Sequence, residues 1–141
     1  MREQILTACL LAAAVAFAGV AAAGETPRPA NAKVYIISPK NGDAVASPVQ
    51  VLFGLSGMGV APAGIEKKNT GHHHLLIDAV VPSANEPILK DAMHLHFGGG
   101  QTEASVKLTP GQHTLQLLLG DHNHIPHNPP VLSQKITITV K

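Results

Sequence analysis

The apolar residues of this chain fall into short runs that turn-forming residues interrupt at intervals of about ten positions. Pro39–Asp43 is typical of a turn because its Asn-Gly pair tolerates positive φ, and Thr109–Gln112 has the proline and glycine that a type II turn requires. The last run alternates strictly, with Ile136, Ile138 and Val140 on one face. This pattern predicts an all-β fold, a single immunoglobulin-like antiparallel β-sandwich.

About seven strands are expected in this sandwich. Helix signals are nearly absent, apart from one short turn of helix that could form at Pro87–Ala92. Two long connections, Gly57–Gly71 and Asp121–Pro130, are rich in glycine or proline, and long loops on a rigid sandwich often carry function. The expected strands are Lys33–Ser38, Val49–Leu55, His72–Ala79, His94–Phe97, Glu103–Leu108, His113–Leu119 and Lys135–Val140.

The N-terminus resembles a secretory signal peptide. Arg2 supplies a positive charge, an apolar run follows from Ile5 to Val20, and Ala21–Ala23 provides the small residues that signal peptidase requires. A transmembrane anchor is the alternative, but the run holds fewer than ~18 strongly apolar residues. Residues 1–23 are therefore predicted to be a cleaved signal peptide, which makes the mature protein periplasmic or secreted, with no membrane span.

The predicted cleavage before Gly24 leaves a leader, residues 24–32, and one domain, residues 33–141. The leader contains prolines and is expected to be disordered. Cys9 is the only cysteine and would leave with the signal peptide. The mature chain then has no thiolate, which excludes cysteine-based zinc fingers, iron–sulfur clusters, blue-copper sites and cysteine nucleophiles.

Charge and motifs exclude several further classes of function. The formal net charge is +1 and Lys67-Lys68 is the only basic pair, so nucleic acid binding is not expected. No Gly-x-Ser-x-Gly sequence occurs, and Gly98–Gly100 is followed by neither a helix nor a Lys-Ser/Thr pair, so neither a hydrolase triad nor a phosphate-binding loop is indicated. Sequence alone leaves open whether the protein is an enzyme.

Histidine supplies the one strong chemical signal of the chain. All nine histidines lie between His72 and His127; eight of them fall in three groups that each contain a His-x-His pattern or a triplet, and His113 stands alone. Neutral imidazole is a preferred ligand of copper and zinc, and two histidines at i and i+2 on a strand point to the same side. The first pair is His72 and His74, while His73 points to the opposite face. The sequence therefore predicts a copper or zinc site with ligands drawn from His72, His74, His94, His96, His122, His124, His127 and Asp121.

Three alternatives to a metal-binding domain stay open at this point. In the first, the protein is a non-catalytic structural or interaction domain of the cell envelope, in which histidines fasten loops to backbone carbonyls and a partner protein binds a rim or sheet edge. In the second, the metal serves an oxidoreductase, although no acidic residue stands in a motif that nominates it as an acid or base. In the third, clustered imidazoles act as a pH switch.

Four sequence blocks resemble those of a bacterial exported family, the domain of unknown function 4399 family. The blocks are Gly71–Asp78, His94–Glu103, Pro110–Leu117 and the segment from Gly120 to Pro130. The resemblance covers roughly Val34 to Lys141 and implies one sandwich domain behind a signal peptide, without a mechanism. It implies that an aromatic residue stands at the position of His96 in relatives, and that the positions to test first are His72, His73, His74, His94, His113, Asp121, His124 and His127.

Overall fold

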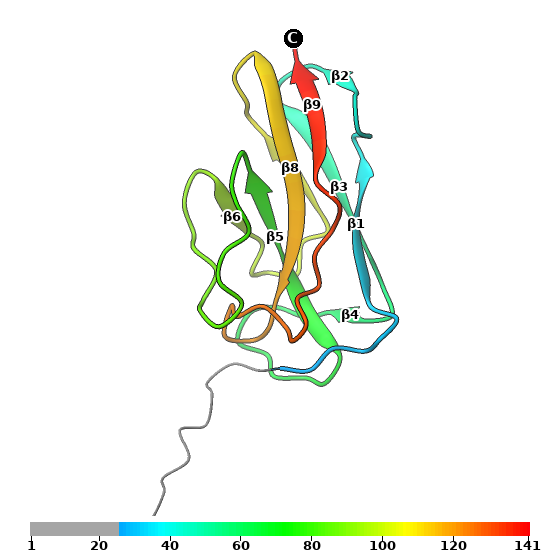
Figure 1. Cartoon of the computed structure of the whole chain (residues 1–141), viewed down its shortest axis with the longest axis vertical. Helices are drawn as coiled ribbons and strands as arrows, with labels where there is room; N and C mark the ends of the chain where they lie inside the picture. The colour runs from blue at the N-terminus through cyan, green and yellow to red at the C-terminus, as the bar shows by residue number, and fades with distance from the viewer. Residues whose placement is uncertain (1–25) are drawn as a thin grey trace, which may run out of the picture.

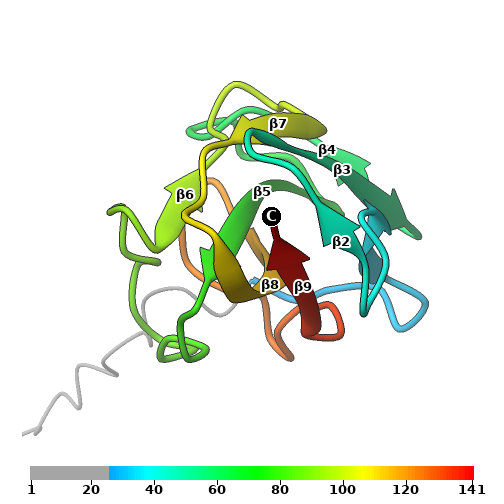
Figure 2. The same ribbon diagram turned by 90° about the horizontal axis from the view of Figure 1, so that it is seen from above.

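Two sheets pack face to face in the computed structural model, which describes residues 26–141 (Figures 1 and 2). The smaller sheet has the order β1-β3-β7, and the larger has the order β2-β9-β8-β5-β4, with β6 paired to β5. No residue from 26 to 141 is helical. The strands are β1 (Lys33–Ser38), β2 (Ala44–Val45), β3 (Val49–Ser56), β4 (Gly59–Val60), β5 (Thr70–Ile77), β6 (His94–His96), β7 (Glu103–Val106), β8 (Gly111–Gly120) and β9 (Ile136–Val140).

This strand order confirms the predicted sandwich. The neighbours β1, β3 and β7 correspond to strands A, B and E of an immunoglobulin domain, and β5, β8 and β9 correspond to C, F and G. All seven expected strands form, with ends shifted by up to two residues. The two extra strands, β2 and β4, are two-residue parallel pairings with β9 and β5, too short to leave a periodic signal in the sequence. The helical turn expected at Pro87–Ala92 does not form.

The hydrophobic core fills the space between the sheets, and strand alternation decides which residues of β5 enter it. Leu75 and Ile77 belong to the main core, whereas Leu76 lies on the outer face of the sheet in a small cluster with Ile88 and Leu118. His72 and His74 share the outer face with Leu76 because they are four and two residues away from it. The outer face of β5 is therefore built from two histidines followed by a leucine.

The N-terminal end of the described chain lies against the sandwich. Pro27 forms a bridge with Asn128, whose backbone N–H donates to the Thr26 carbonyl. The hydroxyl of Thr26 donates to Asp121 at 2.6 Å. Residues 26–32 thus differ from the predicted disordered leader, because these bonds fix them to the loop that follows β8. The predicted signal peptide lies outside the described residues. From residue 26 to 141, no helix is long and apolar enough to cross a membrane.

Candidate metal centre

Strands β5 and β6 bring three histidines together on the outer face of the larger sheet. His72 and His74 are each 1% exposed and point to the same side of β5. The antiparallel register places His96 of β6 directly opposite His74. Directly opposed residues on neighbouring strands have Cβ atoms about 5 Å apart. These three rings therefore meet over one patch of the sheet.

The fourth histidine, His124, comes from the loop after β8, and Asp121 shapes that loop. Asp121 is 1% exposed, and its Oδ1 accepts hydrogen bonds from the backbone N–H groups of Asn123 and Ile125 at 2.8 and 3.0 Å. The N–H of His124 donates to the Asp121 carbonyl at 2.9 Å. His124 has a φ of +64°, a conformation that non-glycine residues rarely adopt. This tight turn holds the imidazole of His124 over the rings of His72 and His96.

We call His72, His74, His96 and His124 the histidine quartet. One potential ligand atom from each lies within 4.8 Å of all the others. Nε2 of His72 is 3.0 Å from Nε2 of His74 and 3.1 Å from Nδ1 of His124. The ring centroids of His96 and His124 are 4.7 Å apart. Nitrogen atoms from three separate segments of the chain thus converge on one small volume.

Burial favours the uncharged form of three members of the quartet, His72, His74 and His96. Burial, with added repulsion from His124 and His96, lowers the pKa of His72 to about 4. Burial and the same kind of repulsion lower the pKa of His74 to about 2. The pKa of His96 is also lowered, by burial and by the nearby His124 and Lys90. Neutral imidazole has a free lone pair, which is the form that binds a metal ion.

Several nitrogens of the quartet have no hydrogen-bond partner. Within residues 26–141, buried Nε2 of His96 and buried Nδ1 of both His72 and His74 find neither a donor nor an acceptor. An unpaired buried polar atom costs about 1–3 kcal/mol. A metal ion would use the lone pair of His96 Nε2. The Nδ1 atoms of His72 and His74 lack the outer acceptor that a metal-bound histidine usually has.

Two glycines leave the space in which the rings lie. A Cβ atom at Gly120 would stand 2.8 Å from Nε2 of His74, and one at Gly98 would overlap the ring of His96. Neither glycine has positive φ, so the requirement is close approach and not backbone conformation. Any side chain at these two positions would displace a member of the quartet.

The quartet opens on one side into a pocket of about 240 Å³. Its far wall comes from the connection between β5 and β6, which is fixed to the site because the N–H of Ile88 donates to the carbonyl of His124 at 2.8 Å. His72 lies behind the other three rings and does not line the pocket. The lining residues are His74, Pro87, Ile88, Lys90, His96 and His124.

The other predicted ligands lie outside the quartet. His94 turns to Asp91, with Nδ1 2.8 Å from the carboxylate. Nε2 of His127 lies 3.1 Å from the Thr70 carbonyl. Asp121 is occupied by the turn described above. His122 points to Asn123 and lies 4.0 Å from Glu66.

Two further histidines have separate environments. His73 is 0% exposed on the core side of β5, with its ring 5.2 Å from that of Phe53, and burial lowers its pKa to about 4. His113 lies at the rim, where Nδ1 is 2.6 Å from Asp78 and Nε2 is 2.8 Å from the Thr109 carbonyl. Neither faces the quartet.

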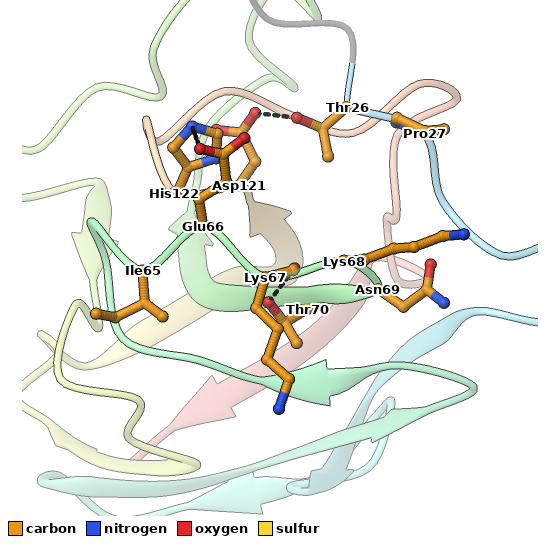
Figure 3. Close-up of a pocket in the computed structure, with 10 residues that line it drawn as sticks. All are labelled: Thr26, Pro27, Ile65, Glu66, Lys67, Lys68, Asn69, Thr70, Asp121 and His122. Carbon is orange, nitrogen blue, oxygen red and sulfur yellow. Dashed lines mark hydrogen bonds and ion pairs between the residues drawn. The ribbon is translucent and has the colours of Figure 1, made fainter.

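A second pocket, of about 200 Å³, lies between the long β4–β5 connection and the N-terminal segment (Figure 3). Asp121 and His122 both line it, but they do not form a ligand set there. Figure 3 shows the Asp121 carboxylate bonded to Thr26, while His122 lies beside Glu66. This pocket therefore brings together two of the predicted ligands without a third.

Sequence reasoning left out the residues that surround the quartet. Gly98 and Gly120 make room for the rings, and Ile88 and Lys90 form the pocket wall. The glycine run after β6 is visible in the sequence but equally typical of a bend. Nothing in the sequence around Lys90 indicates that its connection folds back over the histidines.

The sequence model of the family described as "Domain of unknown function (DUF4399)" matches residues 51–141, and the chain belongs to this family. The match extends from within β3 to the last residue and contains the whole quartet. No curated protein and no solved structure matches the chain.

Proposed function

We propose that this DUF4399 domain binds a transition metal ion, copper or zinc, through His72, His74, His96 and His124, and that it does so outside the cytoplasm. One observation carries the proposal. Four histidines from β5, β6 and the loop after β8 present ligand atoms within 4.8 Å of one another. Copper and zinc are the ions that imidazole ligands suit best.

The spacing of the nitrogen atoms fits a single ion. Four nitrogens at about 2.0–2.1 Å from an ion are separated by about 3.3 Å in a tetrahedron, and by about 2.9 and 4.1 Å in a square plane. The two His72 contacts, 3.0 and 3.1 Å, lie between the tetrahedral and the square-planar neighbour spacing. Small ring movements would bring the remaining separations, at most 4.8 Å, into either range.

The composition of the chain supports a function outside the cytoplasm. The signal-like sequence of residues 1–23 predicts export to the periplasm, and the single cysteine lies within it. An all-imidazole site needs no thiolate, so an oxidising compartment does not inactivate it. Buffering or carrying of copper or zinc in the envelope is the role that this combination favours.

The test is metal content followed by titration. Untagged protein expressed from the full 141-residue sequence is recovered from the exported fraction, analysed for metals, stripped with a chelator and titrated with Cu(II) and Zn(II). We expect close to one ion per chain. His96→Ala should abolish binding, whereas His94→Ala, on the same strand, should leave it unchanged. Wild-type affinity weaker than ~10 µM for both ions, about −7 kcal/mol, would overturn the proposal.

A second candidate, a structural envelope domain, is favoured by the histidines outside the quartet. His127 contacts the Thr70 carbonyl and His113 contacts the Thr109 carbonyl, so each fastens one segment to another. A chain without metal affinity would point to this role, and the next experiment would be a search for an envelope protein partner.

A further inference from the structure

We infer that a Cu(II) ion held by the quartet, which can take a ligand beyond its four nitrogens, keeps a fifth coordination position open to the 240 Å³ pocket, and that a small anion binds there beside Lys90. This inference rests on the proposed metal site and specifies what that site takes up. Three members of the quartet, His74, His96 and His124, line the pocket. An ion bound between them therefore faces the pocket and not only protein.

The charge of the site favours an anion. Four neutral imidazoles leave a divalent ion with its full charge, and the pocket lining contains Lys90 but no carboxylate. Asp121 does not line this pocket, and its oxygens already accept bonds from Thr26, Asn123 and Ile125. An anion that enters from the pocket would therefore neutralise part of the positive charge of the metal ion.

The rest of the pocket strengthens this attraction and limits the size of the ligand. Pro87 and Ile88 form an apolar wall, and Ile88 is 5% exposed. Electrostatic attraction is stronger beside such a wall than in open water. A volume of 240 Å³ is below the ~300–1,000 Å³ typical of pockets for drug-sized ligands, and equals that of roughly eight waters. The ligand class is therefore a small anion with an oxygen or nitrogen donor, such as a short carboxylate.

The position of Lys90 gives the pocket its selectivity for charge. Lys90 and His96 line the same pocket. Lys90 is exposed, so its flexible side chain can bring the ammonium group to an anion that enters the pocket. A neutral molecule of the same size would gain nothing from this contact.

Azide is a suitable probe because its binding to Cu(II) produces a new charge-transfer absorption band. The full-length protein is loaded with one equivalent of Cu(II) in chloride-free buffer at low ionic strength and titrated with sodium azide. We expect a saturable band in the wild type. Lys90→Met should weaken azide binding about fivefold, the effect of one nearby charge in a wet site, and Lys90→Glu should weaken it further. Lys107→Met, an exposed lysine beyond β7, is the matched control and should match the wild type.

Copper affinity is measured separately for each variant, and azide is titrated only at full copper loading. Copper affinity should be unchanged in Lys107→Met and no weaker in the two Lys90 variants, because they remove or reverse a positive charge beside the cation. A copper-loaded protein whose spectrum does not respond to azide would overturn the open position while leaving the metal site standing. An azide response that is equal in the wild type and in Lys90→Glu would overturn the role of the pocket. Failure of copper itself to bind would overturn the metal site and, with it, this inference.

Discussion

The histidines of this protein form two populations that differ in what their rings face. Members of the quartet face one another, and buried Nε2 of His96 has no partner among the described residues. His94, His113 and His127 face carboxylates or backbone carbonyls at 2.6–3.1 Å. A histidine that is already bonded to a carboxylate or carbonyl holds the fold in place, whereas rings that converge without such partners can take an ion. Proximity in sequence does not separate the two populations.

The sharpest test of this difference is to remove one member of each population. His74→Ala should weaken binding of Cu(II) or Zn(II) by more than about 1,000-fold, about 4 kcal/mol, because loss of a ligand exceeds the 10–100-fold that groups behind the ligands contribute. His127→Ala should leave metal affinity within a few-fold of the wild type. Isothermal titration of both variants measures this. Equal losses in the two variants would erase the distinction.

Acid should destabilise the metal-free protein through the buried histidines. The folded pKa of His72 is lowered from 6.5 to about 4, mainly by burial, so the unfolded chain binds more protons between these values. The stabilisation is present above pH 6.5 and is lost as the pH falls towards 4, by about 3 kcal/mol for this residue. Urea unfolding at pH 7 and pH 4.5, with a chelator present, measures the loss. A midpoint that does not move would contradict the lowered pKa.

Asp121 should support the quartet without joining it. Asp121→Ala leaves the backbone N–H groups of Asn123 and Ile125 without their acceptor, so we expect a loss of about 2 kcal/mol in stability. Metal affinity should fall about tenfold because His124 is no longer fixed. Thr26→Val, which removes only the bond to the other carboxylate oxygen, should have a smaller effect on both quantities. A complete loss of binding in Asp121→Ala, with the fold intact by circular dichroism, would make Asp121 a ligand.

His73 should be dispensable to the metal despite its position between two ligands. Within the described chain its two ring nitrogens have no partner, and it packs against Phe53. His73→Leu has a similar volume and removes this penalty, so we expect a stabilisation of about 1 kcal/mol with unchanged metal affinity. Chemical denaturation and metal titration test the two parts. Weaker metal binding in this variant would show that His73 contributes to the metal site together with the quartet.

The smallest effect is expected at the rim. The Asp78 contact raises the pKa of His113, so the pair stabilises the fold below pH 6.5 and this contribution is lost as the pH rises through the higher folded pKa. Because the side chain of Asp78 is 41% exposed, solvent screens the pair, and His113→Ala should cost less than about 1 kcal/mol at pH 6. Thermal unfolding at pH 6 and pH 9 should show the difference between variant and wild type shrinking at the higher pH.

Strand periodicity correctly predicts much of the site. The positions that it misses are decided by contacts between side chains of different segments. Alternation alone predicts that His72 and His74 share a face and His73 does not, and the two hydrophobic clusters confirm it. The same rule groups His94 with His96, but it cannot reveal that Asp91 lies within 2.8 Å of His94 and turns that ring away. In the loop, only a turn built on Asp121 directs His124 inward and leaves His122 outside. Such choices depend on contacts between segments that the local pattern does not encode.

The clearance at Gly98 and Gly120 also provides a signature for recognising the site in other chains. The ring of His74 fits only because position 120 has no side chain, and the ring of His96 fits only because position 98 has none. The site can therefore be written as a pattern: His-x-His on one strand, His-x-Gly on the next, and Gly-Asp-x-x-His in the loop. A member of the family with alanine or a larger residue at either glycine should lack the metal. One with an aromatic residue at the position of His96 should bind the metal no better than His96→Ala does.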